Sequence, residues 1–202
     1  MVVDHPQLGR VNMTVQVTGD SPDQQVQDTI DLMRRYVIED ARRPELQQAM
    51  LPVRHAHPST QVEHAYALTK GKLSFVQDRT ISRPVESHAQ GLPVVEVLIR
   101  PIDVINGVTM GDCDDFSMLL SALLAAAGVP VSFVTAAADD GQPGVYSHVY
   151  VAAYPQGQRV ALDASHGPYA GWEVQRASRL KEWPVNWAGN GNGNGNGSGG
   201  WS

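Results

Sequence analysis

Apolar residues in the first half of the chain recur mostly at helical spacing. An amphipathic helix is predicted over about residues 23–42, and a second, short helix between the prolines at positions 44 and 52. A third helix is expected over residues 59–70, with Ser59 as its cap. One short strand is predicted before them at residues 11–17, where apolar and polar residues alternate.

The pattern is weaker in the middle of the chain. Residues 73–76 predict a strand or the approach to a loop. Residues 80–93 predict a long loop, because they contain two prolines and a glycine. Two short apolar runs follow at residues 94–99 and 102–105. Each run fits a helix or a strand, and both alternatives stay open here.

The second half of the chain has one apolar helix followed by strands. The helix is predicted over residues 113–127, with Gly128 as its C-terminal cap. Alternating strands follow at residues 131–135, 147–154 and 159–163, separated by turn-rich segments. The helix is thus followed by three strands in meander order.

Length and composition fit one soluble domain. The chain has 202 residues, of which 42% are hydrophobic, and this is enough for one sizeable core. Its net charge of −6 argues against nucleic acid as a partner, since nucleic-acid binding normally uses a basic surface. The longest apolar run is too short to span a membrane, and residues 1–10 do not resemble a secretory signal. We therefore expect a cytoplasmic protein, unless a larger assembly carries it elsewhere.

Three segments are predicted along the chain. Residues 1–20 form an N-terminal strand or arm. Residues 21–188 form a single domain, with a helical part at 21–72 and a core at about 73–188. Residues 189–202 are rich in glycine and asparagine and cannot bury apolar surface, so we expect a flexible tail there.

The only cysteine of the chain, Cys113, lies at the predicted start of the apolar helix. Such a cysteine is commonly a small buried core residue. However, partial positive charge at a helix N-terminus stabilises the thiolate, which is the nucleophilic form. Asp112 is placed to cap this helix, and Asp115 to complete a capping box. These acids oppose ionisation of the thiol, so the sequence leaves its protonation state open.

His148 and Asp163 lie on consecutive predicted strands, which a short hairpin would place side by side. A nucleophilic cysteine needs a base to take its proton and a third group to orient that base. His148 offers the imidazole, and Asp163 offers a carboxylate at the end of the next strand. An aspartate at the end of a strand is more often a simple turn residue. Asp163 is therefore a candidate for the orienting group only in combination with Cys113 and His148.

Four segments contain these residues in order: Gly111-Asp112-Cys113-Asp114-Asp115, Ala127-Gly128-Val129-Pro130-Val131, Ser147-His148-Val149-Tyr150-Val151 and Ala161-Leu162-Asp163-Ala164-Ser165. Together they resemble the transglutaminase-like superfamily, in particular its small bacterial and prophage-encoded members. The resemblance covers roughly residues 90–172. It implies the α+β class and a papain-like core, in which the helix that carries the cysteine packs against an antiparallel sheet that carries the histidine and the aspartate. The helices of the first half would then form an N-terminal extension of this core. We expect the protein in a bacterial or host cell, or carried in a virion.

The resemblance also implies roles for individual residues. Cys113 would be the nucleophile, His148 the general base and acid, and Asp163 the orienting group. The oxyanion would be held by the backbone N–H of Cys113 and by an upstream polar side chain, for which Gln90 and Asn106 are candidates on residue type only. No cofactor and no metal are expected, and zinc-binding relatives with cysteine pairs are excluded by the single cysteine.

Other polar and aromatic residues have simpler interpretations. His55 and His57 have no acid or cysteine cluster nearby, which disfavours a metal site. His166 is interpreted as a turn histidine, with the rim of the site as the alternative, and residues 139–141 as a turn rather than a calcium loop. Three tryptophans are predicted to cover the core, with a partner-binding patch as the lesser alternative: Trp172, Trp183 and Trp187.

Two functions from different classes follow from the sequence. The first is thiol acyl transfer on the amides of a protein or peptide substrate, as a cysteine peptidase or amidase rather than an amine-transferring transglutaminase, because nothing marks an amine site. The second is a non-enzymatic structural or assembly module, with phage structural proteins as partners. The reactivity of Cys113 separates the two.

Overall fold

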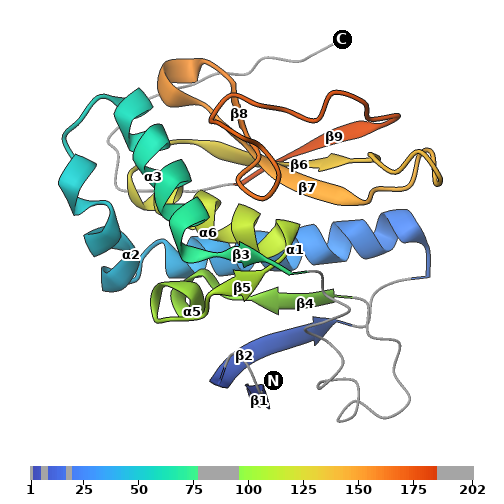
Figure 1. Ribbon diagram of the computed structural model, residues 1–202, viewed down its shortest axis with the longest axis horizontal. Coiled ribbons are helices and arrows are strands. Elements are labelled where there is room, and N and C mark those ends of the chain that lie inside the picture. Colours follow the sequence, from blue (N-terminus) through green and yellow to red (C-terminus); the bar gives the residue numbers. More distant parts are fainter. Residues whose placement is uncertain (1, 6–8, 17–19, 77–95, 186–202) are drawn as a thin grey trace, which may run out of the picture.

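A four-stranded antiparallel sheet lies over a central helix in the computed structural model, which describes residues 2–5, 9–16, 20–76 and 96–185 (Figure 1). The strand order of the sheet is β8-β7-β6-β9. The strands are β6 (Val131–Ala136), β7 (His148–Ala153), β8 (Val160–Leu162) and β9 (Leu180–Pro184). The α+β class predicted from the sequence is confirmed.

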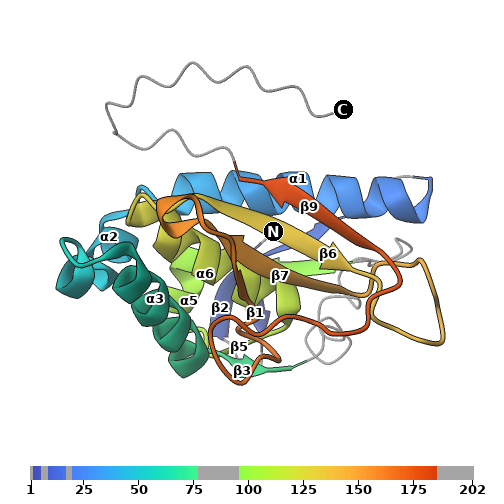
Figure 2. The same ribbon diagram turned by 90° about the horizontal axis from the view of Figure 1, so that it is seen from above.

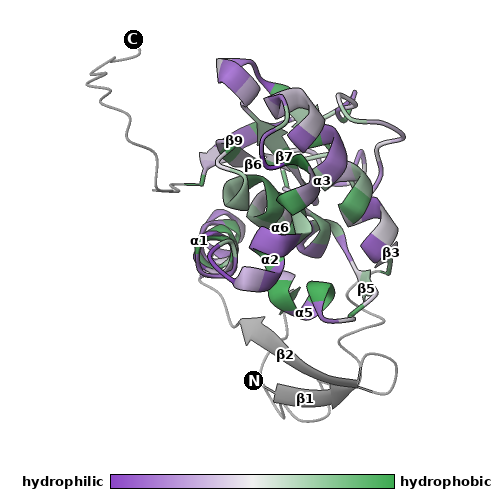
Figure 3. Ribbon diagram, turned by 90° about the vertical axis from the view of Figure 1, so that its left-hand side faces the viewer, coloured by the Kyte–Doolittle hydropathy of each residue, from purple (hydrophilic) through white to green (hydrophobic). Residues whose placement is uncertain are grey.

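The central helix is α6 (Cys113–Ala126), and residues 114–125 of it are all buried. A helix that is apolar on every side must be covered on every side. The sheet covers one side of α6, and helices of the first half cover the others (Figure 3). These helices are α1 (Pro22–Asp40), α2 (Pro44–Ala49), α3 (Pro58–Lys72) and α5 (Pro101–Ile105). The helical extension is therefore part of the same core as the sheet.

Both ends of α6 follow from capping residues. At its start, a carboxylate oxygen of Asp115 accepts the backbone N–H of Asp112 at 3.1 Å, and the predicted capping box is present. At its end, Gly128 has a φ of +79°, and its N–H donates to the carbonyl of Ala125. A residue with a Cβ would be strained in this left-handed cap. The predicted helix is confirmed, and it ends one residue early.

The segment before α6 is tied to β4 (Glu96–Ile99) through Asp115. The second carboxylate oxygen of Asp115 accepts the backbone N–H of Ile99 at 2.7 Å. A Cβ on Gly111 would lie only 2.6 Å from the carboxylate of Asp115, so glycine is the residue that fits there. The position of Cys113 is thus set by the capping group of its own helix.

The predicted helices of the first half are present, with shifted ends. Helix α1 is capped by the side chain of Ser21. Helix α3 begins at Pro58, and its cap is His57 rather than Ser59, because Nδ1 of His57 accepts the backbone N–H of Ser59. Proline at the first position sets this start, since it needs no hydrogen-bond acceptor. None of the described helices is long and apolar enough to cross a membrane.

The structure resolves the two ambiguous apolar runs differently. The run at residues 94–99 contains strand β4, whereas the run at 102–105 belongs to helix α5. Asp40 at the end of α1 anchors this helix, since its carboxylate accepts the backbone N–H of Ile102 and the guanidinium of Arg100. The long loop predicted at residues 80–93 lies outside the described residues.

Two further sheets are small. Strand β2 (Gly9–Gln16), which confirms the strand predicted at residues 11–17, pairs antiparallel with β1 (Val2–His5) and with β4. Strand β3 (Ser74–Phe75) pairs in parallel with β5 (Met110–Gly111). This pairing brings Phe75 to the segment that precedes Cys113.

The predicted meander of three strands is present, and β9 adds a fourth strand that the sequence analysis did not predict. Strand β9 pairs with the free edge of β6. Its one buried side chain is Trp183, whose Nε1–H donates to Oγ1 of Thr135 at 2.9 Å, so this tryptophan covers the core as predicted. Figure 2 shows α1 along the β9 side of the sheet, where Arg179 donates to Asp23. Trp187 and the predicted tail lie outside the described residues.

Candidate active site

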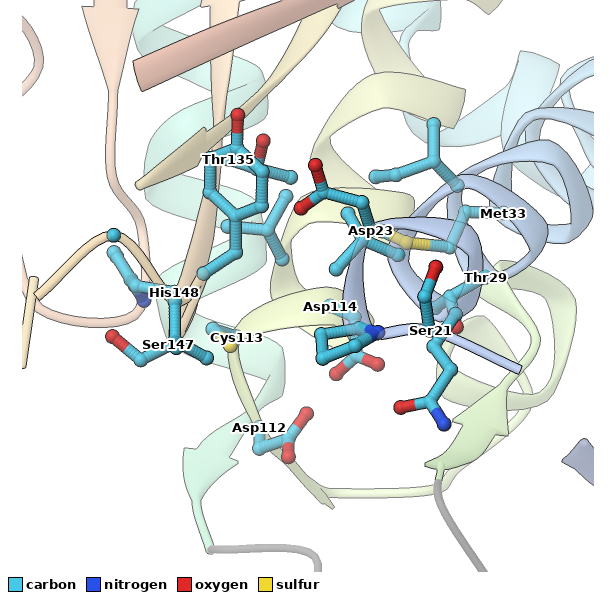
Figure 4. Close-up of a pocket in the computed structure, with 18 of the residues that line it drawn as sticks. Ser21, Asp23, Thr29, Met33, Asp112, Cys113, Asp114, Thr135, Ser147 and His148 are labelled. Atoms are coloured by element: carbon cyan, nitrogen blue, oxygen red, sulfur yellow. The ribbon is translucent and has the colours of Figure 1, made fainter. Parts of the chain in front are cut away.

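Cys113 and His148 line one cavity of about 1010 Å³ (Figure 4). In the close-up, Cys113 and His148 lie on the same side of the cavity, across from Ser21, Thr29 and Met33. Cys113 is the first residue of α6, and His148 is the first residue of β7. The opposite wall is the N-terminal half of α1, from Ser21 to Met33. The two residues predicted as nucleophile and base therefore face the same space.

The hairpin of β7 and β8 brings His148 to Asp163, as the sequence analysis predicted. Val151 pairs with Leu162 in this antiparallel ladder, and Asp163 directly follows β8. Continuing the register places Asp163 opposite Tyr150, so its side chain points to the same face as that of His148. Nε2 of His148 lies 2.8 Å from Oδ2 of Asp163. This hydrogen bond leaves Nδ1 of His148 as the nitrogen able to accept a proton.

Asp163 is fully buried, and each of its carboxylate oxygens accepts hydrogen bonds. Oδ2 faces His148, while Oδ1 accepts the backbone N–H of Ser165, the hydroxyl of Ser165 and the backbone N–H of His166. Burial by itself raises the pKa of Asp163. The hydrogen bond and the charge of His148 act in the opposite direction, as do the hydrogen bonds from His166 and Ser165, and together they lower the pKa to about 2. The carboxylate is therefore ionised at neutral pH.

Helix α3 holds the turn that follows Asp163. The hydroxyl of Tyr66 lies 3.2 Å from the carbonyl of Asp163 and 2.8 Å from that of Gly167, and Nζ of Lys70 donates to the same carbonyl of Gly167. Burial and the nearby charge of Asp163 raise the pKa of Tyr66 to about 12, so its phenol stays a donor. A helix of the N-terminal extension thus positions the third member of the site.

His166 stands directly against His148. The two ring centroids are 4.9 Å apart, and the ring planes are nearly perpendicular. On its other side, His166 meets the ring of Phe75 at 4.7 Å. The interpretation of His166 as a turn histidine holds for its backbone, which donates to Asp163, while its ring occupies the rim of the site.

Ser117 links the start of α6 to β7. Its hydroxyl lies 2.6 Å from the carbonyl oxygen of Cys113 and 3.2 Å from that of Val149, the residue after His148. Because one buried hydroxyl contacts both backbones, it sets the distance between the first turn of α6, which carries Cys113, and strand β7, which carries His148. The sequence analysis did not single out this serine; its one signal was a polar residue inside an apolar run.

We expect the exchange Ser117→Ala to lower the reactivity of Cys113 toward iodoacetamide several-fold and to destabilise the fold by about 1 kcal/mol. The matched control is Ser121→Ala, one turn later on the same helix. The hydroxyl of Ser121 is buried and has no hydrogen-bond partner among the described residues, so its loss should be neutral or stabilising. Alkylation rates and chemical unfolding measure both effects. Equal reactivity in the two variants would show that Ser117 does not position the cysteine.

Two acidic side chains adjoin the sulfur. Ligand atoms of Asp112, Cys113 and Asp114 all lie within 4.8 Å of one another. Negative charge at this distance disfavours a second negative charge, so the thiolate needs a compensating cation. His148 lines the same cavity as the sulfur.

A metal ion does not fit this arrangement well. Potential ligand atoms of His148, Asp163 and His166 also lie within 4.8 Å of one another. However, the carboxylate of Asp163 already accepts four hydrogen bonds, one of them from the ring of His148. Coordination through this carboxylate would break charge-assisted bonds that the fold has already formed. The cluster is better explained as a hydrogen-bonded set.

Of the two side chains predicted as oxyanion donors, only Asn106 belongs to the described residues. Asn106 is exposed at the C-terminal end of α5 and does not line the cavity. Gln90 lies outside the described residues. The backbone N–H of Cys113 is at the first position of α6, among the N–H groups that point out of a helix N-terminus. Its role as oxyanion donor stays a prediction.

Comparisons with known proteins give few matches. No family model matches the sequence, and no curated protein matches it. Among solved structures, the chain is similar to a "putative cysteine protease" from Cytophaga hutchinsonii, with a TM-score of 0.42 and 18% identity over 78% of this chain and 50% of that chain. It is also similar to a "putative protease" from Parabacteroides distasonis, with a TM-score of 0.39 and 15% identity over 66% of this chain and 26% of that chain. This chain therefore spans a half and about a quarter of these two proteins.

Proposed function

We propose that this protein is a thiol acyl-transfer enzyme that hydrolyses peptide or side-chain amides with Cys113 as nucleophile. The observation that carries the proposal is the hydrogen bond of 2.8 Å between Nε2 of His148 and Oδ2 of Asp163, at the wall of the cavity that Cys113 also lines. It fixes the tautomer of His148 with its basic nitrogen on Nδ1. A nucleophile, a base and an orienting acid are the three parts that this chemistry requires.

The reaction begins with transfer of the thiol proton of Cys113 to Nδ1 of His148. The thiolate attacks the carbonyl carbon of the amide, and the oxyanion that forms accepts the backbone N–H of Cys113. The imidazolium of His148 then donates its proton to the amide nitrogen, the C–N bond breaks and the amine leaves. A thioester remains on Cys113.

Water completes the cycle. His148, now neutral, takes a proton from water as the water attacks the thioester. Collapse of the second oxyanion breaks the C–S bond and releases the carboxylic acid, and the imidazolium of His148 returns its proton to the sulfur. An amine in place of water would make the same site a transglutaminase. We favour water because no described residue around the cavity marks a site for a second amine.

The cavity also supports a polypeptide substrate. Its volume of about 1010 Å³ is at the upper end of ligand pockets, which suits several residues of a peptide rather than a single small group. Its α1 wall offers the apolar side chains of Val26, Ile30 and Met33, whereas Asp112 and Asp114 adjoin the nucleophile. We therefore expect substrates with an apolar residue near the cleaved bond and without acidic neighbours.

Alkylation of the only cysteine tests the proposal directly. We expect iodoacetamide to modify Cys113 at pH 6–7 at least about tenfold faster than it modifies free cysteine, because an ion pair holds the sulfur as a thiolate. Cleavage of a mixed peptide library, followed by mass spectrometry, should depend on Cys113 and stop in Cys113→Ala. Modification at the rate of free cysteine, with no cleavage beyond that of Cys113→Ala, would overturn the proposal and would favour the alternative of a structural or assembly module.

A further inference from the structure

The ring of His166 is the outer cover of the catalytic histidine. His148 is only 9% exposed in its side chain, although it begins a strand at the wall of a cavity. Perpendicular contact at 4.9 Å places His166 over one face of this ring, and Phe75 meets His166 at 4.7 Å in turn. His166 and Phe75 are themselves exposed, so they form the layer between solvent and His148.

The second link between the two histidines runs through Asp163. Nδ1 of His166 lies 2.9 Å from the hydroxyl of Ser165, and this hydroxyl lies 2.8 Å from Oδ1 of Asp163. The single proton of the hydroxyl goes to the carboxylate, because a hydrogen bond to an ionised acceptor is the stronger one. His166 must then donate its Nδ1–H to Ser165. A chain of hydrogen bonds thus joins His166, through the hydroxyl of Ser165, to the carboxylate of Asp163, which also accepts Nε2–H of His148.

The charge state of His166 suits a covering role. Partial burial lowers its pKa, as do His148 and Lys70, while Asp163 acts in the opposite direction. The ring is therefore neutral near pH 7. A neutral ring can lie against the imidazolium of His148 without the repulsion that a second cation would cause.

We propose that His166 is a positioning residue that excludes water from the hydrogen bond between His148 and Asp163 and, by ring contact, keeps Nδ1 of His148 directed at Cys113. The inference rests on the proposed function, in which Nδ1 of His148 takes the proton of the thiol. Its physical basis is that a hydrogen bond shielded from water is stronger and better defined in direction. A ring that loses this cover can rotate away from the sulfur.

Three exchanges at position 166 separate the contributions of the ring and of the hydrogen bond. His166→Ala removes both, His166→Phe keeps the ring, and His166→Asn keeps a donor for Ser165. All three retain the backbone N–H that Asp163 accepts. The matched control is His55→Ala, at an exposed histidine outside the site. Thermal unfolding verifies that each variant is folded.

Two readouts apply to every variant. The first is the rate of Cys113 alkylation at pH 6–7, which we expect to fall roughly tenfold in His166→Ala and His166→Asn, and to return to within about threefold of the natural rate in His166→Phe. The second is the proton NMR signal of Nε2–H of His148, identified by its absence in His148→Gln. This downfield signal should broaden through water exchange in the alanine and asparagine variants and sharpen again with phenylalanine.

The outcomes distinguish the inference from the function on which it rests. Natural rates and an unchanged signal in all three variants would overturn the role of His166 while leaving Cys113 as nucleophile. Recovery with asparagine but not with phenylalanine would also overturn it, since the ring contact would then be unnecessary. If the natural protein is alkylated no faster than free cysteine, the proposed function fails, yet the NMR signal still decides whether His166 covers the pair.

Discussion

Exchange of His148 for glutamine is expected to lower amide hydrolysis by about a thousandfold, within the range observed for loss of a general acid and base. Glutamine can still donate through its amide to Oδ2 of Asp163, which the natural imidazole contacts at 2.8 Å. It has no basic nitrogen to take the proton of Cys113 and none to return it to the leaving amine. The variant should therefore fold normally and lose its chemistry.

The same variant changes the thiol itself. The exchange removes the base proposed to take the proton of the thiol, while the acids at positions 112 and 114 still disfavour a thiolate at Cys113. We expect its alkylation at pH 6–7 to fall to the rate of free cysteine or below it. The control is His55→Gln, an exposed histidine whose exchange should change neither rate. A His148→Gln protein that retains a tenth of the natural turnover would remove His148 from the mechanism.

Exchange of Asp163 for asparagine should reduce both activity and acid-dependent stability. Asparagine presents either an N–H group or a carbonyl to Nε2 of His148, so the imidazole is no longer held in one tautomer, and we expect hydrolysis to fall roughly 10³–10⁴-fold. The loss of charge also weakens the bonds that Oδ1 accepts from Ser165 and His166. Because Asp163 itself is fully buried, water cannot restore the weakened bonds at its position, and the variant should be destabilised by about 2–4 kcal/mol.

The pH dependence of stability gives a second, independent signature of Asp163. Its pKa is lowered from 3.8 to about 2 in the folded protein, so the unfolded chain binds this proton more readily. The resulting stabilisation, about 2 kcal/mol, is fully present above pH 4 and is lost as the pH falls from about 4 to 2. Unfolding in urea across this range should show the loss in the natural protein and in the exposed control Asp140→Asn, but not in Asp163→Asn. Equal pH slopes in all three would contradict the buried ion pair.

Local sequence patterns predicted the elements that carry Cys113, His148 and Asp163, the residues proposed as catalytic. The capping pair around Cys113 and the glycine after Ala127 define α6, because caps satisfy the end groups of a helix within a few residues. Alternation and a short turn predicted the β7–β8 hairpin, and hairpin register is a local property. The cysteine, the histidine and the aspartate were therefore predictable by position.

The surroundings of these residues were not predictable, because they depend on contacts between distant segments. The α1 wall of the cavity, the cover of His148 by His166 and Phe75, and the support of the turn after Asp163 by Tyr66 all join residues far apart in the chain. Strand β9 was missed because it is an edge strand whose side chains, apart from Trp183, are exposed, and this leaves no clear alternation.

By itself, then, the sequence determined the α+β class, the helix that begins at Cys113 and the hairpin that carries His148 and Asp163, since each depends on hydrogen bonds and periodicity within short segments. Only the tertiary structure decided that Nε2 of His148 hydrogen-bonds to Asp163 and that the ring of His166 lies against His148. The same holds for Ser117, which links the turn of Cys113 to strand β7. Side-chain direction and exclusion of water arise from packing, and packing depends on residues that no local pattern connects.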